Sequence, residues 1–263
     1  MRVSFIGGGT MGEAIVKCLL DKNIAVPGDI IVSDVSESRR ELLRGEYRVN
    51  TLADNRKAME DSDIAVLAVK PQDLNKVMEE IKNPPSEQVV LSIVAGASLA
   101  SLCQGLNHPY LVRAMPNMPA QIAWGMTIWT ATAEVDQRQK DLAQSILSAL
   151  GEEIYLPDEK YIDMATALSG SGPAYIFLII EALIDAGVHI GLSRDIAQKL
   201  VIQTVLGSTY AMQKTGKHPA ELRNMVTSPG GTTTEALLKL EKGGLRGLFL
   251  EAVAAAYDKA KQL

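Results

Sequence analysis

The chain has 263 residues, a formal net charge of −5 and a hydrophobic content of 47%. This length is enough to bury a core, the composition excludes general disorder, and the negative balance leaves no basic footprint for nucleic acid or an anionic membrane. The two cysteines match no metal or redox spacing and suit a reducing cytosol, and no apolar run reaches the roughly 18 residues of a membrane span. We therefore expect a cytoplasmic protein without a metal site and without a nucleic-acid or membrane partner.

Strand-like and helix-like segments alternate in the first half of the chain. Apolar runs predict strands at 3–6, 30–32, 64–69, 89–94, 110–115, 126–130 and 153–156. Helical spacing predicts helices at 13–21, 38–44 and 137–150. Continuous apolar strands that alternate with helices are typical of a parallel sheet covered on both faces. We predict a doubly wound α/β domain over residues 1–160.

The second half of the chain, after Pro157, has long helical patterns and no strand pattern. Helices are predicted at 174–186, 193–214, 219–226, 232–242 and 245–261. The segment Ala174–Ala186 is apolar on almost every face, so a helix there must be buried. We predict an all-helical domain over residues 161–263, with this apolar helix in a subunit interface.

A glycine cluster follows the first predicted strand and opens the first predicted helix. Gly7-Gly8-Gly9-Thr10-Met11-Gly12 fits the pattern G-x-G-x-x-G. Such glycines permit a tight turn and let the backbone approach a pyrophosphate, which the helix N-terminus stabilises. The cluster predicts a dinucleotide site that uses Gly7, Gly9, Thr10, Met11 and Gly12. The alternative is a plain glycine-rich turn.

The choice between NADH and NADPH stays open in the sequence. Asp34 ends the second predicted strand, where an acid binds a ribose 2′-hydroxyl and favours NAD. Ser36, Arg39 and Arg40 follow and could hold a 2′-phosphate instead, or simply start a solvated helix. Three further loops stand at predicted carboxyl ends of strands and are candidates for the same ligand: Val69-Lys70-Pro71, Ala95-Gly96 and Met115-Pro116-Asn117.

A second candidate ligand site lies at residues 227–235, whose sequence is Thr-Ser-Pro-Gly-Gly-Thr-Thr-Thr-Glu. Thr232 and Glu235 have the spacing of a capping box that opens a helix. The preceding glycines expose backbone N–H groups, and Ser228, Thr232 and Thr233 add hydroxyls, so the turn suits a carboxylate or a phosphate. The alternative is an ordinary capped turn. Another hydroxyl–glycine turn, at 168–173, could face the cofactor or form an interdomain hinge.

Together these stretches resemble Δ1-pyrroline-5-carboxylate reductases, the last enzymes of proline synthesis. The resemblance covers essentially the whole chain. It rests on residues 5–11, 68–71, 113–119, 168–175 and above all 226–233, which is very similar to the family signature. It implies an N-terminal Rossmann domain that binds NADPH or NADH, followed by a helical dimerisation domain. It also implies homodimers that interlock through their helices and often assemble into decamers.

The resemblance also assigns residues. It places the substrate carboxylate at Ser228, Gly230, Gly231, Thr232 and Thr233, with the Thr233 hydroxyl bonded to the ring nitrogen as the catalytic group. It adds cofactor contacts at Asn55, Ala68, Val69, Lys70 and Pro71. Asp34 departs from the family, since many members have Asn or Ser there and prefer NADPH. The implied reaction is hydride transfer from nicotinamide C4 to C5 of the iminium, without a strong general acid.

Two other functions compete with this interpretation. A β-hydroxyacid dehydrogenase has the same two-domain plan, but it needs a lysine base after the domain junction. No lysine occurs between Lys160 and Lys199. A non-catalytic nucleotide sensor would bind the cofactor without turnover, and the intact turn at 228–233 counts against it.

Overall fold

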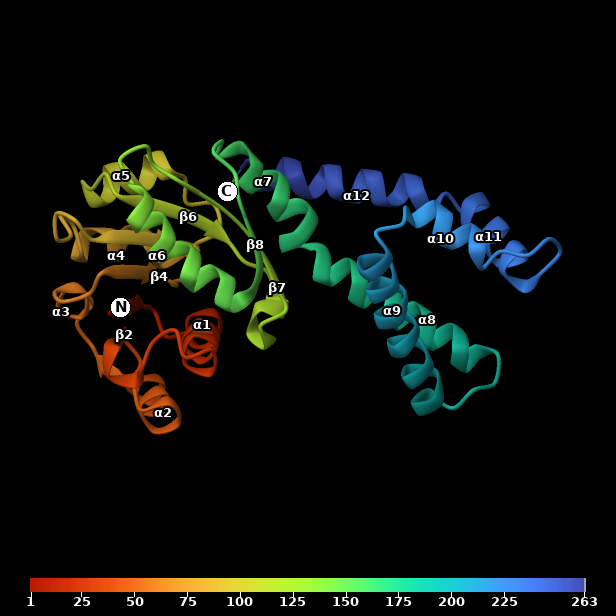
Figure 1. Ribbon diagram of the computed structural model, residues 1–263, viewed down its shortest axis with the longest axis horizontal. Coiled ribbons are helices and arrows are strands. Elements are labelled where there is room, and N and C mark those ends of the chain that lie inside the picture. Colours follow the sequence, from red (N-terminus) through yellow and green to blue (C-terminus); the bar gives the residue numbers. More distant parts are fainter. Residues whose placement is uncertain (263) are drawn as a thin grey trace. The chain divides into compact units, whose positions relative to one another are not determined.

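The computed structural model describes residues 1–262, which form two compact units (Figure 1). The first unit comprises Met1–Ser171 and the chain from Ala256 onward, and the second comprises Gly172–Ala255. The first unit runs past the predicted domain boundary at residue 160. The reason is that helix α7 (Lys160–Ala165) packs on strands β6 and β7 of the first unit.

One eight-stranded sheet forms the centre of the first unit, in the order β3-β2-β1-β4-β5-β6-β7-β8. Its strands are β1 (Val3–Ile6), β2 (Ile30–Ser33), β3 (Asn50–Leu52), β4 (Ile64–Leu67), β5 (Val89–Ser92), β6 (Leu111–Met115), β7 (Gly125–Ala131) and β8 (Gly151–Tyr155). Neighbouring strands are parallel except β6 and β7, which are antiparallel. The order reverses between β1 and β4, so a topological switch point lies at their carboxyl ends, where open α/β sheets bind ligands.

Helices cover both faces of this sheet, which confirms the predicted doubly wound α/β class. They are α1 (Thr10–Asp21), α2 (Glu37–Tyr47), α3 (Asn55–Met59), α4 (Leu74–Glu80), α5 (Leu99–Leu106) and α6 (Gln137–Leu147), with short 3₁₀ turns at Pro27–Asp29, Pro71–Asp73, Met118–Ile122 and Ser148–Leu150. Successive residues of one strand enter different cores: Val66 packs in one cluster, and Ala65 and Leu67 pack in the other. This two-sided burial explains the unbroken apolar runs.

The second unit is helical. It contains α8 (Gly172–His189), α9 (Arg194–Thr215), α10 (Pro219–Met225), α11 (Thr232–Lys242) and most of α12 (Leu245–Ala260). Within the single chain α8 has no buried residue, so its predicted burial in a subunit interface stays a prediction. Phe177 is 52% exposed and Leu178 is 65% exposed. Large apolar side chains that are exposed in this way indicate an interaction surface.

The same apolar character gives one segment the length and composition of a membrane span. It runs from Lys160 to His189 and is 30 residues long. One such segment is weak evidence for a membrane, since an apolar helix that packs against protein passes the same test.

Candidate active site

The parallel strands bring most of the predicted cofactor residues to one edge of the sheet. The glycine loop follows β1, Asp34 follows β2, Asn55 follows β3, Ala68–Pro71 follow β4, Ala95–Gly96 follow β5, and Asn117 follows β6. Because β1 and β4 are neighbours at the switch point, the glycine loop lies beside the β4 loop. Hydrogen bonds from Gly7 N to Ser33 O and from Ala68 N to Ile6 O, both 2.9 Å long, tie these strand ends together.

The three glycines that match the pattern G-x-G-x-x-G have different roles in the loop. Gly7 has φ +102°, and a Cβ there would stand 2.7 Å from the carbonyl oxygen of Ala68. A Cβ on Gly12 would collide with the carbonyl oxygen of Gly7. Gly9 has φ −66° and no atom within 4 Å of a Cβ position. The protein's own packing therefore requires Gly7 and Gly12, whereas Gly9 leaves open space at the start of α1, which no side chain caps.

Asp34 holds the glycine loop through its carboxylate. Its Oδ2 accepts a 2.9 Å hydrogen bond from Gly8 N, and its Oδ1 accepts a 2.8 Å bond from Ser36 N. A carboxylate oxygen has a second lone pair, so Asp34 can still accept a bond from a ribose hydroxyl. Asp34 thus shapes the loop in addition to the ribose role that its position predicts.

Arg39 is engaged within the protein. Its Nε donates to the carbonyl oxygen of Gly8, and its Nη2 forms an ion pair with Glu13. Glu13 also accepts a 2.8 Å bond from the Tyr47 hydroxyl. Burial raises the pKa of Glu13, but the bonds from Tyr47 and Arg39 outweigh it and hold that pKa below its ordinary value. Burial and the bond to Glu13 raise the pKa of Tyr47 to about 12.

Arg40 is engaged as well. Its Nη1 donates to the carbonyl oxygens of Asp34 at 2.7 Å and Val35 at 3.1 Å. Both arginines that could hold a 2′-phosphate therefore already have partners in this conformation. The sequence analysis missed the roles of Glu13 and Tyr47, because no short-range pattern pairs residues on two different helices.

Two asparagines are predicted as cofactor contacts. In each of them, both the oxygen and the nitrogen of the side-chain amide form a hydrogen bond within the protein. Asn55 Oδ1 lies 2.6 Å from the Ser33 hydroxyl, and its Nδ2 donates to Glu80 at 2.7 Å. Asn117 donates from Nδ2 to Ser169 O at 3.1 Å, and its Oδ1 accepts from Met126 N at 2.9 Å. These side chains order the loops at the sheet edge. Lys70, by contrast, is exposed at the start of the Pro71–Asp73 turn.

The turn that precedes α11 differs in one respect from the sequence prediction. The predicted capping box of Thr232 and Glu235 is wrong, because Gly231 is the N-cap and Thr232 is already the first helical residue. The turn is closed instead by bonds from Gly231 N and the Thr234 hydroxyl to Ser228 O, at 3.1 and 2.8 Å. The helix start therefore has no side-chain cap.

This turn needs both of its glycines and leaves a hydroxyl free. Gly230 has φ +69°, and a Cβ on Gly231 would stand 2.5 Å from Ser228 Oγ. Within the described residues, the hydroxyl of Thr233 has no hydrogen-bond partner. Uncapped helical N–H groups, a glycine approach and a free hydroxyl form a site that suits a small carboxylate.

The predicted hydroxyl–glycine turn at 168–173 is wrong as a turn. Residues Thr166–Gly170 form a π-helical turn that continues α7 into α8, closed by a 2.8 Å bond from Ser171 N to Thr166 O. The hydroxyls of Thr166 and Ser169 donate to carbonyls one turn earlier, at Ile162 and Ala165. The segment is helical because its polar groups are satisfied within the helix.

Comparison with known proteins places this geometry in a family. Residues 159–263 match the family described as pyrroline-5-carboxylate reductase dimerisation, and residues 2–96 match NADP oxidoreductase coenzyme F420-dependent. The chain is 43% identical to a pyrroline-5-carboxylate reductase of Synechocystis over 100% of this chain and 98% of that one.

Solved structures agree over almost the whole length. A pyrroline-5-carboxylate reductase of Coxiella burnetii is 40% identical, with a TM-score of 0.92 over 99% of this chain and 97% of that one. The Plasmodium falciparum enzyme, whose crystal structure has NADP bound, is 32% identical, with a TM-score of 0.91 over 100% of this chain and 97% of that one. The chain therefore belongs to the pyrroline-5-carboxylate reductase family, oxidoreductases that reduce Δ1-pyrroline-5-carboxylate to proline with NADPH or NADH.

Proposed function

We propose that the turn at Ser228–Thr233 binds the carboxylate of pyrroline-5-carboxylate, while the loops at the carboxyl edge of the sheet bind NADPH or NADH. One observation carries the substrate half of this proposal: α11 starts without a side-chain cap, behind Gly230 in the left-handed conformation. A helix start of this kind presents backbone N–H groups and the positive end of the dipole to an anion.

The residues at the sheet edge fit a dinucleotide. The open space at Gly9 and the uncapped start of α1 suit a pyrophosphate, because its oxygens can accept bonds from the first amides of the helix. Thr10 and Met11 begin that helix, and Asp34 lies beside it for the ribose. The bound cofactor supplies a hydride from nicotinamide C4. The chain itself contributes the position and orientation of both reactants.

The catalytic role of the second site is positioning. The N–H groups at the start of α11 hold the carboxylate, and the Thr233 hydroxyl oxygen accepts the iminium N–H. When hydride adds to C5, the π electrons of the C=N bond become the lone pair of the ring nitrogen. The iminium enters already protonated, so no side chain has to act as a general acid. Fixed geometry of this kind supplies about 7 kcal/mol or more in the best cases.

The chain uses both cofactors in our proposal. The Asp34 carboxylate disfavours a 2′-phosphate by charge repulsion, and Arg39 is paired with Glu13. Arg39 is still 24% exposed, so it can turn towards a 2′-phosphate if the ion pair opens. NADPH binding therefore has to break an existing contact, whereas NADH binding does not.

The assembly that fits the helical half is a homodimer whose apolar helices cover each other, located in the cytoplasm. The exposed face of α8 carries this part of the proposal, and association of such dimers into decamers extends it. Sedimentation at micromolar concentration should show no active monomer. A stable, active monomer would contradict it.

A comparison of two substrates tests the carboxylate site. We expect wild-type kcat/KM for pyrroline-5-carboxylate to exceed that for 1-pyrroline, which lacks the carboxylate, by at least about tenfold, the effect of one bond to a charged group. In Gly231→Val this ratio should fall towards one, because the side chain would meet Ser228. The cofactor dissociation constant is the control and should stay at its wild-type value. An unchanged ratio would place the substrate carboxylate elsewhere, and activity on 3-hydroxyisobutyrate alone would favour the hydroxyacid dehydrogenase.

A further inference from the structure

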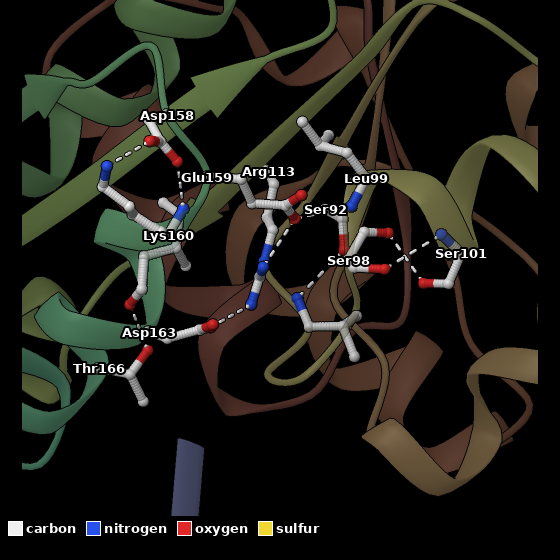
Figure 2. Close-up of polar contacts among 12 residues, drawn as sticks. Ser92, Ser98, Leu99, Ser101, Arg113, Asp158, Glu159, Lys160, Asp163 and Thr166 are labelled. Carbon is white, nitrogen blue, oxygen red and sulfur yellow. Dashed lines mark hydrogen bonds and ion pairs between the residues drawn. The ribbon is translucent and has the colours of Figure 1, made fainter. Parts of the chain in front are cut away.

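A buried arginine on β6 joins three segments near the cofactor edge (Figure 2). The side chain of Arg113 is 7% exposed. Its Nη1 lies 2.7 Å from Glu159 Oε1, and its Nη2 lies 3.0 Å from Asp163 Oδ1. The two carboxylates stand at the start of α7 and one turn further along it. A single guanidinium therefore fixes both the place and the direction of this helix on the sheet.

Glu159 extends the contact to a third segment. The same Oε1 accepts a 2.7 Å hydrogen bond from the backbone N–H of Leu99, the first residue of α5. Helix α5 directly follows the loop with Ala95 and Gly96, which we propose as a cofactor loop. The strand that carries Arg113 leads to Asn117, and the Asn117 amide bonds Ser169 O in the π-helical turn. The cluster of Arg113, Glu159 and Asp163 thus fixes the first residue of α5, which follows one proposed cofactor loop, and strand β6, which precedes another. It also fixes the start of α7.

Stability alone is a poor reason for this arrangement. Burying a charge costs solvation free energy, and replacing a buried ion pair by apolar residues of similar volume is often neutral or stabilising. A guanidinium fork instead gives strict geometry, since its two Nη groups bind two carboxylates in fixed directions. Such fixed geometry suits a site where a small displacement of the surrounding loops would slow the reaction.

We propose that Arg113 is a positioning residue for hydride transfer. It holds the loop before α5, the end of β6 and the start of α7 in one fixed arrangement beside the bound cofactor. This inference rests on the proposed function. It concerns the hydride-transfer step and not the affinity for either ligand.

The test compares three variants that can be assayed in the full chain. Asp163→Asn removes one arm of the fork, and Arg113→Lys keeps the charge but loses the fork. Asp158→Asn is the matched control: it breaks the exposed ion pair with Lys160 at the same helix start, while the amide oxygen can keep the 3.0 Å bond to Lys160 N.

We expect Asp163→Asn to lower kcat about tenfold, and Arg113→Lys by up to about a hundredfold, the range for a displacement of about 1 Å. The deuterium isotope effect on kcat, measured with cofactor deuterated at the transferred position, should rise in both variants. The dissociation constants of NADH and NADPH should change much less than kcat, because the loops keep their contacts to the cofactor while the geometry of the reacting atoms is disturbed. Asp158→Asn should match the wild type in all of these measurements.

A merely structural role gives a different result. If both variants lower the melting temperature but keep the kcat and isotope effect of Asp158→Asn, the inference is overturned while the proposed function stands. Asp163→Asn alone decides the matter if Arg113→Lys does not fold. A wild-type enzyme that fails to turn over pyrroline-5-carboxylate would overturn the proposed function together with the inference.

Discussion

Alanine substitutions at Gly9 and Gly12 should separate cofactor binding from folding within one loop. Gly12→Ala places a methyl group against the carbonyl oxygen of Gly7. Overpacking of this kind costs about 1–3 kcal/mol. At about 2–4 °C per kcal/mol, the melting temperature should fall by about 2–12 °C.

Gly9→Ala should leave the fold intact and weaken the cofactor. Its φ of −66° suits alanine, and no protein atom lies within 4 Å of the new Cβ. A poorer N-cap and a less flexible unfolded chain have opposite effects of similar size, so the melting temperature should change by less than about 3 °C. The methyl group stands where the pyrophosphate approaches. Loss of one bond to that charged group costs about 1.5–3 kcal/mol, which raises the dissociation constant about 10- to 150-fold.

Calorimetric titration with NADH and NADPH, together with thermal melting, measures both quantities on the same samples. Gly45→Ala is the control, since Gly45 lies inside α2 with nothing within 4 Å of its Cβ position. It should raise the melting temperature slightly and leave both dissociation constants unchanged. A wild-type dissociation constant in Gly9→Ala would refute the pyrophosphate placement, and a wild-type melting temperature in Gly12→Ala would refute the packing argument.

Three further substitutions test single residues. Asp34→Ser should raise the ratio of kcat/KM for NADPH to that for NADH by at least about tenfold, because about 1.4 kcal/mol of repulsion is relieved; an unchanged ratio in steady-state assays would show that Asp34 does not read the ribose. In Thr233→Ala, kcat/KM should fall by an amount equivalent to about 2–3 kcal/mol, with little change in cofactor affinity. A kcat/KM near the wild-type value would show that the turn only starts the helix and does not bind the substrate. Burial lowers the pKa of His108, and the bond to Gln88 O only partly offsets this effect. The native state therefore resists protonation of His108 more than the unfolded state does. As the pH drops below about 6.5, the free energy of unfolding should fall by at most about 1.4 kcal/mol per pH unit. The melting temperature of His108→Gln should lack that part of the slope between pH 7.5 and 5.5, and an unchanged slope would contradict this assignment.

Local patterns were sufficient for the first strand, the glycine loop and the first helix of the cofactor edge. The apolar run at Val3–Ile6 and the glycines after it predicted β1, the loop and α1, because strand burial and a tight turn leave direct marks on neighbouring residues. Strand β3 was missed because its three residues are partly or fully exposed and carry no apolar run. Helix α3 was missed because five residues are too few to show helical periodicity.

The start of α11 shows where local patterns fail. Thr232 and Glu235 have the spacing of a capping box, yet the helix begins one residue earlier than the box requires. The backbone of Gly230 and the bonds to Ser228 O set that start, and a spacing rule does not contain them. The candidate substrate turn was nevertheless predictable, since glycines and hydroxyls before a helix indicate an anion site whichever residue is the cap.

The doubly wound domain, the helical second half, the family and the two candidate ligand turns could all be predicted before the fold was known, because each depends on residues that are neighbours in the chain. The contacts between side chains that are distant in the sequence became known from the folded chain. It paired Arg39 with Glu13 and joined Arg113 to Glu159 and Asp163, which lie 46 and 50 residues away along the chain. It also showed that α8 stays uncovered within one chain. Contacts of this kind depend on how distant elements pack, and no pattern of neighbouring residues records that packing.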